Sequence, residues 1–489
     1  MSILIVVNNP RDWPLHIAGV EVVAAKDYLA MPAYSGLRGA KVFNLCRSYR
    51  YQALGYYVSL LAAARGHRPL PSINAIQDLK SRTITRFVSD ELYTLIQRSL
   101  AHLRSEEFEL SIYFGRNVAK HYDRLSLQLF NLFPAPLLRA RFVRGRHWQL
   151  QSISPIGAKD IPLEHHTFVI EAATGYFAGR GVRRRRRRAS RYDLAILHNP
   201  QEPTPPSNER AIKRFVRAAE QVGFGVELIV RNDFARLAEF DALFIRETTN
   251  VNHHTYRFAR RADAEGLVVI DDPNSILRCT NKVFLHELLA RHRVPTPATT
   301  IVTRDRLRVL ARELQFPCIL KQPDSAFSQG VVKVDDAEAF LRKGGQLLAR
   351  SELIVAQVFL PTTFDWRVGV FDRKALYVCR YYMADEHWQI VRRDPDGATV
   401  EGDSDTLSVE EAPTQVVRLA LRAANLIGNG LYGVDLKQSG KRCYVIEVND
   451  NPSIDAGVED LVLKDDLYRT VTAGIMRRVE ERKRVGYRD

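Results

Sequence analysis

The sequence predicts a multidomain chain of mixed class, α/β in its first part and α+β toward its end. Its 489 residues are enough for about three domains of 100–200 residues each. Between residues 192 and 270, strand-like apolar runs alternate with helix-like stretches, which is typical of a parallel sheet with crossover helices. After residue 318 the strand-like runs follow one another closely, and this pattern favours an antiparallel arrangement.

Residues 1–180 are predicted to form an N-terminal accessory α/β domain. Strand-like runs occupy residues 3–7, 41–45 and 110–114, and a helix-like run spans residues 51–65. The polar and aromatic residues 44–51 are as consistent with a surface loop as with a binding loop. No internal repeat is apparent along the chain.

Six consecutive arginines, Arg183–Arg188, lie within residues 181–191. Six like charges cannot pack together, so we expect an exposed linker between domains. Contact with RNA or another polyanion is the functional alternative. The net charge of +15 does not decide between them, because a basic surface also suits nucleotides and acidic substrates.

Membrane and secreted classes are disfavoured. The longest apolar stretch, residues 54–64, is about half as long as a membrane span. The first residues resemble a β-strand more than a signal peptide. The five cysteines are scattered, odd in number and without the paired spacing of a metal site. We therefore predict a cytoplasmic protein without membrane contact.

Residues 192–280 are predicted to form a second domain and residues 281–480 a third. The third begins with a helix near Asn281, which ends before the prolines Pro295 and Pro297. Strands are expected at residues 318–322, 330–334, 353–359, 367–371 and 375–383, a helix at 413–427, and final strands at 432–437 and 443–448.

The strongest chemical signal lies in these final strands. A turn at residues 438–441 joins them, so Asp435 and Glu447 are expected to face each other, with Asn449 just beyond. Mg²⁺ prefers oxygen ligands and commonly uses one or two carboxylates together with substrate phosphates. Acidic residues that cap turns are the ordinary alternative. However, an unpaired charge in the apolar strand around Glu447 would be costly, and a metal would compensate it.

Two lysines upstream suit phosphate binding. Lys321 ends one predicted strand, and a loop containing Ser325, Ser328, Gln329 and Gly330 follows it. Such a loop can fold over phosphates and donate backbone N–H groups, while a lysine supplies a compact charge. Lys282 opens the preceding helix. Either lysine alone would usually be a surface residue. Their order relative to the acidic strands is what favours phosphate binding.

Two other patterns are judged misleading. The string Gly428–Gly433 matches G-x-G-x-x-G, but it follows a helix and opens a strand, so we expect a helix end and a turn. The histidine pairs His165-His166 and His253-His254 lack evident partner ligands in the sequence. We expect ordinary surface or core roles for both pairs.

With these parts in order, residues 192–479 resemble the RimK-type ATP-grasp ligases. The most specific pieces are Gly433-Val434-Asp435-Leu436 and Val445-Ile446-Glu447-Val448-Asn449-Asp450-Asn451-Pro452. The resemblance implies a Rossmann-like pre-ATP-grasp domain followed by an ATP-grasp fold, in which two α+β subdomains clasp ATP. The segments at 12–14, 43–52 and 66–71 are similar to an N-terminal domain fused to some RimK-like proteins.

The resemblance also implies roles for individual residues. Asp435, Glu447 and Asn449 match the ligands of Mg²⁺ or Mn²⁺, and Lys282 and Lys321 match the lysines that hold ATP phosphates. The other matched nucleotide positions are the adenine hinge Gln357, Val358 and Phe359, the ribose contact Asp365, and Gln389. Gln357 stands where many relatives have a glutamate.

Arginines are expected to handle the reacting groups. Around Gln389, relatives commonly place an arginine near the transferring phosphate. Here that role falls to Arg392 or Arg393, or it is changed. Arg246 and Arg367, near predicted strand ends, suit bidentate contacts with a carboxylate, although ordinary surface pairing is as consistent. Asn451 and Ser453 are further substrate-binding candidates.

The expected activity is an ATP-dependent carboxylate–amine ligation through an acyl phosphate, with release of ADP. ATP and two Mg²⁺ ions, or Mn²⁺, are the expected cofactors. The donor is glutamate or a similar amino acid, and the acceptor is a small or peptide carboxylate. The alternatives are a RimK-type ligase that modifies a protein tail, and a non-catalytic nucleotide- or RNA-binding module. Retention of both lysines and all three metal ligands argues against the latter. We also expect a homo-oligomer.

Overall fold

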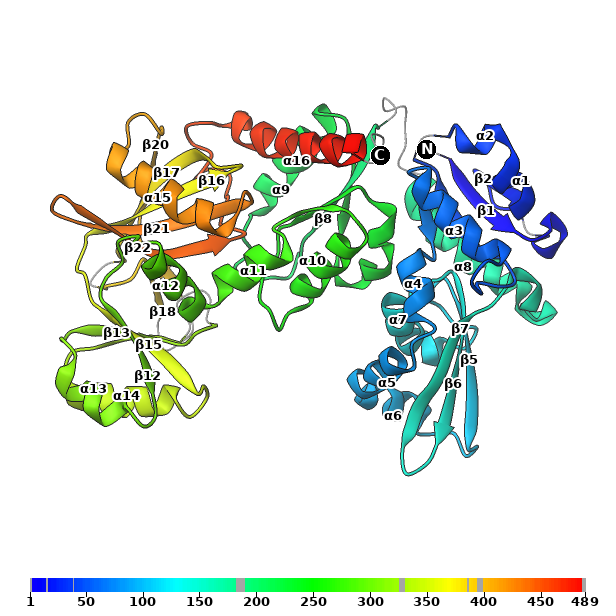
Figure 1. The fold of residues 1–489 in the computed structure, drawn as a ribbon, viewed down its shortest axis with the longest axis horizontal. Helices are drawn as coiled ribbons and strands as arrows, with labels where there is room; N and C mark the ends of the chain where they lie inside the picture. Colours follow the sequence, from blue (N-terminus) through cyan, green and yellow to red (C-terminus); the bar gives the residue numbers. More distant parts are fainter. Residues whose placement is uncertain are drawn as a thin grey trace.

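The computed structural model describes residues 2–14, 16–37, 39–181, 190–324, 330–384, 387–393 and 399–485 (Figure 1). Arg183–Arg188 and the loop residues Ser325, Ser328 and Gln329 lie outside these ranges. Among the described helices, none combines the length and apolarity needed to cross a membrane.

The chain begins with a parallel sheet of order β2-β1-β3-β4. Its strands are β1 (Ile3–Val7), β2 (Val20–Ala24), β3 (Lys41–Asn44) and β4 (Arg68–Leu70). The helices of this unit are α1 (Ala25–Ala30), α2 (Pro32–Ser35), α3 (Leu54–Ala64) and α4 (Ile73–Asp78). The inner strands β1 and β3 are almost wholly buried, because side chains on both faces of a parallel sheet are covered.

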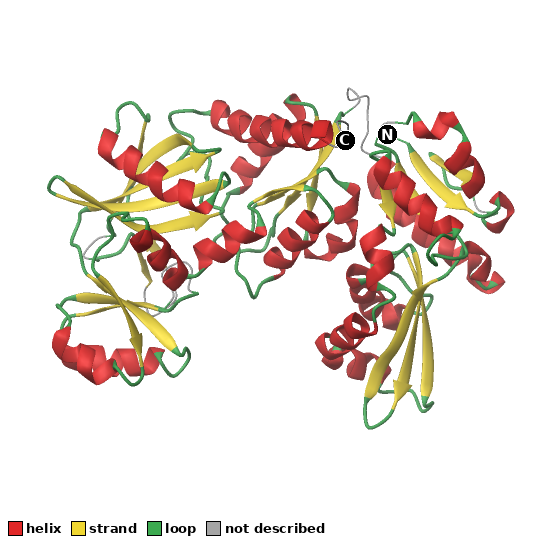
Figure 2. Ribbon diagram, viewed as in Figure 1, coloured by secondary structure: helices red, strands yellow, loops and turns green. Residues whose placement is uncertain are grey.

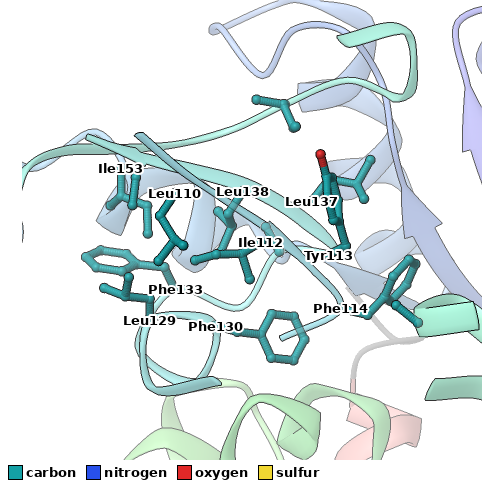
Figure 3. Packing of buried hydrophobic residues seen from close by; sticks show 14 of the residues in the cluster. Leu110, Ile112, Tyr113, Phe114, Leu129, Phe130, Phe133, Leu137, Leu138 and Ile153 are labelled. Atoms are coloured by element: carbon teal, nitrogen blue, oxygen red, sulfur yellow. The ribbon is translucent and has the colours of Figure 1, made fainter. Parts of the chain in front are cut away.

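An antiparallel sheet of order β5-β6-β7 continues the N-terminal part (Figure 2). Its strands are β5 (Glu107–Tyr113), β6 (Leu137–Arg144) and β7 (Trp148–Pro155), and its helices are α5 (Arg82–Glu91), α6 (Tyr93–Leu100), α7 (Asp123–Leu132) and α8 (His166–Gly181). Leu110 and Ile112 of the sheet pack against Leu129 and Phe133 of the α7 region, and all four are fully buried (Figure 3).

The central unit confirms the predicted parallel sheet, with order β11-β10-β8-β9. It consists of β8 (Tyr192–Leu197), α9 (Glu209–Gln221), β9 (Phe224–Ile229), β10 (Ala242–Ile245), α10 (His254–Ala264), β11 (Val268–Ile270) and α11 (Pro273–Thr280). The C-terminal helix α16 (Asp465–Val485) returns to pack beside α9 (Figure 1), where the Phe215 and Tyr468 rings lie 4.7 Å apart.

The first and the central parallel sheets repeat one topology, which the sequence does not reveal. In both, a first strand is flanked by the second and third, and a helix leads through a glycine to the edge strand. The glycines Gly66 and Gly266 share φ values of 69° and 75°, which favour glycine over other residues. Ser72 and Asp272 then cap the next helix. The two units therefore share the left-handed glycine and the helix cap of this turn.

Salt bridges join these two units. Lys41 of the first sheet lies 3.4 Å from Glu239, and Arg68 pairs with Asp241 at the start of β10. Arg261 of α10 lies 3.6 Å from Asp78 of α4. The N-terminal part therefore contacts the central unit through specific charged pairs rather than through the linker alone.

The last part consists of two α+β units. One has the antiparallel sheet β12-β15-β13-β14, from β12 (Thr299–Thr303), β13 (Cys318–Lys321), β14 (Val331–Val334) and β15 (Leu353–Val358), with α13 (Leu307–Glu313) and α14 (Ala337–Leu347). The other has the sheet β20-β17-β16-β21-β22, from β16 (Phe364–Phe371), β17 (Lys374–Tyr382), β20 (Ser404–Leu407), β21 (Leu431–Ser439) and β22 (Arg442–Asp450), with α15 (Thr414–Ile427). Helix α12 (Lys282–Arg291) and the hairpin of β18 (Val391–Arg393) and β19 (Thr399–Glu401) complete this part.

Candidate nucleotide and metal site

Asp435 and Glu447 face each other across the last two strands, as the hairpin at residues 438–441 predicts. They are direct partners in the antiparallel register of β21 and β22, and Gly433 is opposite Asn449. Asn449 Nδ2 donates to Asp435 Oδ2 at 2.9 Å. Opposed residues of an antiparallel pair have neighbouring Cβ atoms, so three oxygen-bearing side chains share one patch of the sheet.

Arg367 of β16 holds the Asp435 carboxylate from the other side. Its Nε donates to Asp435 Oδ1 and its Nη2 to Oδ2, the latter at 3.0 Å, which makes a bidentate pair. The two residues are partners in the register of β16 and β21. Arg367 therefore fixes the orientation of a predicted metal ligand, a contact that spacing along the sequence could not reveal.

The two predicted phosphate-binding lysines lie close to this sheet and line one cavity. Lys282 Nζ is 2.8 Å from Glu447 Oε1, and Lys321 Nζ donates to Gln357 Oε1 at 2.8 Å. Burial alone would raise the pKa of Glu447, but Lys282 and Lys321 outweigh it and lower that pKa. Burial lowers the pKa of Lys321 to about 8. Lys282 lowers the pKa of Lys321 further, whereas Glu447 opposes the shift.

A small cavity of about 20 Å³ lies between the two α+β units. Lys282, Lys321 and Gln357 line it together with apolar side chains of α12, β15 and β22, and with Thr296 and Thr299. Gln357 is oriented from both ends, because its Nε2 also donates to Thr299 Oγ1 at 3.0 Å. The sequence-predicted lysines and the first hinge residue thus border one space.

The predicted adenine hinge runs along the end of β15. The N–H of Val358 donates to Ala298 O and that of Phe359 to Pro317 O. The Phe359 ring meets Trp388 edge-on at 6.0 Å, and Lys333 Nζ lies 5.0 Å from its centroid. Trp388 precedes Gln389, whose Oε1 is 3.2 Å from His387 Nε2. The segment at 387–389 therefore lies against the hinge.

Other nucleotide-site candidates take up defined positions. Asp365 pairs with Lys437 at 2.6 Å, a partner that the sequence did not suggest. Gly330 has a φ of 69°, and a Cβ there would lie 2.5 Å from Gln322 Oε1, so this end of the loop requires glycine. Arg392 and Arg393 belong to β18, whose backbone pairs with Val400 and Thr399, and their side chains are outside the described part.

Among the candidates whose side chains the structure describes, Arg246 is the most buried, with an exposed fraction of 1%. Its guanidinium donates to Ser207 Oγ, to Asn451 Oδ1 at 2.7 Å and to Pro452 O at 2.8 Å, and it also contacts Pro206 O. Burial lowers its pKa to about 10. Arg246 thus holds the turn after β22 against the central unit. Its predicted contact with substrate stays a prediction.

Asn451 joins three segments at that turn. It has a φ of 47°, its backbone N–H donates to Asp271 Oδ2 at 2.7 Å, and its Nδ2 donates to Glu247 O at 2.7 Å. Burial raises the pKa of Asp271 to about 7. Ser453, two residues on, accepts through its backbone oxygen from the Tyr377 hydroxyl at 3.1 Å. The end of β22 is therefore positioned by residues that follow β10 and β11.

The side chains present fit a hard divalent cation. Asp435, Glu447 and Asn449 offer carboxylate and amide oxygens, the donors that Mg²⁺ and Mn²⁺ prefer, and they offer no thiol or imidazole. Arg367 and Lys282 neutralise two of these groups. A bound cation would compete with both contacts, so the oxygen cluster is charge-balanced without one.

Comparisons with known proteins agree with this arrangement. A family model described as a RimK-like ATPgrasp N-terminal domain matches residues 25–172, and one described as an ATP-grasp domain matches residues 279–454. Together the two models cover more than half of the chain.

Curated proteins and solved structures are similar over about half of the chain. An alpha-aminoadipate–LysW ligase of Saccharolobus solfataricus is 24% identical over 255 residues, 49% of this chain and 88% of that protein. A probable alpha-L-glutamate ligase of Xanthomonas euvesicatoria pv. vesicatoria is 26% identical over 249 residues, 50% of this chain and 78% of that protein. The crystal structure of a RimK domain protein ATP-grasp from Sphaerobacter thermophilus aligns with a TM-score of 0.43 at 16% identity, covering 58% of this chain and 99% of that one.

Proposed function

Because the chain belongs to the ATP-grasp proteins that carry a RimK-like N-terminal domain, we propose that it joins a carboxylate to an amine at the expense of ATP. Proteins of this family generally use ATP and a divalent metal, and we propose that this chain binds two metal ions. The observation that carries the proposal is the register of Asp435 against Glu447, with Lys282 paired to the same glutamate. This arrangement supports the proposal, because it brings carboxylate oxygens and a lysine cation close together.

The proposed reaction has two steps. A carboxylate oxygen attacks the γ-phosphorus of ATP, the bond from that phosphorus to the β,γ-bridging oxygen breaks, and ADP leaves. The amine then attacks the acyl carbon, phosphate is expelled, and the amine loses a proton to complete the amide. Mg²⁺, when bound, neutralises charge on the phosphate oxygens.

The chain's own residues position the reactants in this scheme. Lys282 and Lys321 bind phosphate oxygens, Gln357–Phe359 hold the adenine, and Asp365 contacts the ribose. Arg367 keeps Asp435 in one orientation, and Arg246 and Asn451 keep the turn after β22 in place for the substrate. Exclusion of water from the acyl phosphate falls to the segments on either side of the nucleotide.

An amino acid is the proposed donor, since the names of two similar proteins contain α-aminoadipate and L-glutamate. The acceptor is a small or peptide carboxylate, and modification of a protein tail stays the alternative. Association of several copies stays a prediction, to be measured by light scattering of the purified chain.

The experiment that tests the function is a screen for products. The purified full chain is incubated with ATP, Mg²⁺, pooled amino acids and pooled carboxylates, and ADP and new masses are followed. We expect ADP release with a mass equal to the two reactants less one water. Glu447→Gln should abolish both, and Glu410→Gln, an exposed carboxylate, should change neither. The absence of nucleotide binding in the folded chain would refute the proposal.

A further inference from the structure

A second group of metal-binding side chains lies in the central unit, outside the candidate site. Glu247 follows β10 by two residues, and His253 and His254 stand at the start of α10. One ligand atom from each of the three lies within 4.8 Å of the other two. The group is therefore at the carboxyl end of a parallel sheet, where proteins of this architecture bind ligands.

Three buried polar atoms of these side chains have no hydrogen-bond partner among the described residues. Glu247 is 2% exposed and His254 is 7% exposed. Among the described residues, Glu247 Oε2 and both ring nitrogens of His254 have no hydrogen-bond partner. His254 Nε2 is 2.8 Å from Glu247 Oε1, but the two atoms lack hydrogen-bond geometry. Leaving such groups unsatisfied destabilises the fold, and one cation would satisfy them together.

The third side chain is oriented for metal binding by its neighbour. Thr255 is fully buried, and its hydroxyl donates to Thr248 O at 3.2 Å. The same hydroxyl oxygen lies 3.0 Å from His253 Nδ1. Because the hydroxyl proton is already committed, Nδ1 carries the proton in this contact. The lone pair of His253 is then on Nε2, and a hydrogen bond to the far nitrogen is how proteins usually fix a metal-binding imidazole.

Neighbouring residues connect this group to the candidate nucleotide and metal site, although the two sites have no ligand in common. The carboxylate of Glu202 accepts from Thr248 N at 3.1 Å, which adds a second acid beside the group. The backbone oxygen of Glu247 accepts from Asn451, at the end of the strand that carries Glu447 and Asn449. A cation bound by Glu247 would therefore affect the position of the turn after β22, which contains Asn451.

We propose that Glu247, His253 and His254 bind one divalent cation of the zinc class, such as Zn²⁺, Ni²⁺ or Co²⁺. Two imidazoles and one carboxylate are a donor set of borderline softness, which suits these ions, whereas Mg²⁺ favours oxygen alone. Three protein ligands leave a fourth coordination position for water or a substrate group. The cation is distinct from those at Asp435, Glu447 and Asn449.

Isothermal titration with ZnCl₂ tests the proposal on the EDTA-treated full chain in saturating Mg²⁺, which occupies the oxygen site. We expect one equivalent of Zn²⁺ to bind and to raise the melting temperature. Glu247→Gln and His254→Asn should each weaken binding at least about tenfold. His166→Asn, in the other histidine pair, should leave the affinity unchanged.

Two further measurements test the proposal if one of these variants fails to fold. Thr255→Val keeps the side-chain shape but removes the contact to His253, and it should weaken Zn²⁺ binding by about 10–100-fold. Co²⁺ bound to the wild-type chain should give the visible absorption of a four- or five-coordinate site. A folded wild-type chain that binds no Zn²⁺ would show that Glu247 and His254 form only an ion pair, and would overturn the proposal.

Discussion

Lys282 Nζ lies 2.8 Å from Glu447 Oε1, so the first residue of α12 is tied to the strand that carries the metal-binding candidates. The two residues are far apart in the sequence and come from different elements. This contact couples the proposed phosphate-binding charge to the proposed metal ligand.

Removing that charge should weaken nucleotide binding. Lys282→Met keeps most of the side-chain length but leaves Glu447 without its partner and the phosphates without a cation. We expect the dissociation constant for Mg·ATP, measured by calorimetry, to rise at least about tenfold, or about 1.4 kcal/mol. Lys213→Met, at an exposed lysine of α9, is the control. Equal affinities in the two variants would contradict the assignment of Lys282.

The Arg367–Asp435 pair should depend on the planar shape of the arginine side chain as well as on its charge. Arg367→Lys keeps the charge but cannot make two parallel hydrogen bonds, so Asp435 loses its fixed orientation. We expect turnover to fall at least about tenfold and the half-saturating Mg²⁺ concentration to rise.

The same sheet offers a matched control. Arg380 makes a bidentate pair with Asp405 between β17 and β20, away from the candidate metal ligands. Arg380→Lys should leave turnover and Mg²⁺ dependence nearly unchanged. If both variants lose activity alike, the effect of Arg367 is on the sheet rather than on Asp435.

Arg246 should matter first for stability. Arg246→Met leaves Asn451 Oδ1, Ser207 Oγ and two carbonyl oxygens buried without their donor. We expect a loss of about 3 kcal/mol or more in unfolding free energy, seen by chemical denaturation. Arg210→Met, at an exposed arginine of α9, should be close to wild type. An unchanged stability of Arg246→Met would contradict the structural role given to this residue.

The N-terminal unit should lose stability in mild acid. His67 Nε2 contacts Leu37 O at 3.0 Å, and Nδ1 is 2.8 Å from the Tyr28 hydroxyl, so the neutral ring satisfies both. Burial lowers the pKa of His67 from its usual value of 6.5. The unfolded chain therefore binds a proton first, and stability falls as the pH drops through about 6.5 toward the folded pKa.

Thermal unfolding at a series of pH values checks this expectation. The melting temperature of His67→Gln should fall less between about pH 7.5 and 5.5 than that of the wild type. His16→Gln, at an exposed histidine, should follow the wild type. Identical slopes for His67→Gln and the wild type would show that His67 does not titrate as described.

Local pattern was enough to predict the final hairpin and the opposition of Asp435 and Glu447, but β2, β4, β6, β7, β12 and β20 were not predicted. Alternating apolar residues and a short turn determine the register of a hairpin, and both are visible in one sequence. The central parallel sheet was predictable for a similar reason, since its strands and helices alternate regularly.

Contacts between distant segments were not predictable. Nothing near Asp435 in the sequence indicates Arg367 as its partner, or Asn451 as the partner of both Arg246 and Glu247. The pairing of His253-His254 with Glu247 was missed, because a loop of five residues brings them together only in the fold. The repeated topology was hidden because turn geometry can persist while apolar side chains change.

The transfer of oxygen from acceptor to phosphate tests the central claim most directly. Once the product screen has identified the acceptor, its carboxylate is labelled with ¹⁸O, and the phosphate released with ATP and amine is examined by mass spectrometry. An acyl phosphate requires one ¹⁸O in the phosphate for each amide formed, with ADP as the other product. Unlabelled phosphate, or release of AMP and pyrophosphate, would contradict the proposed ligase chemistry.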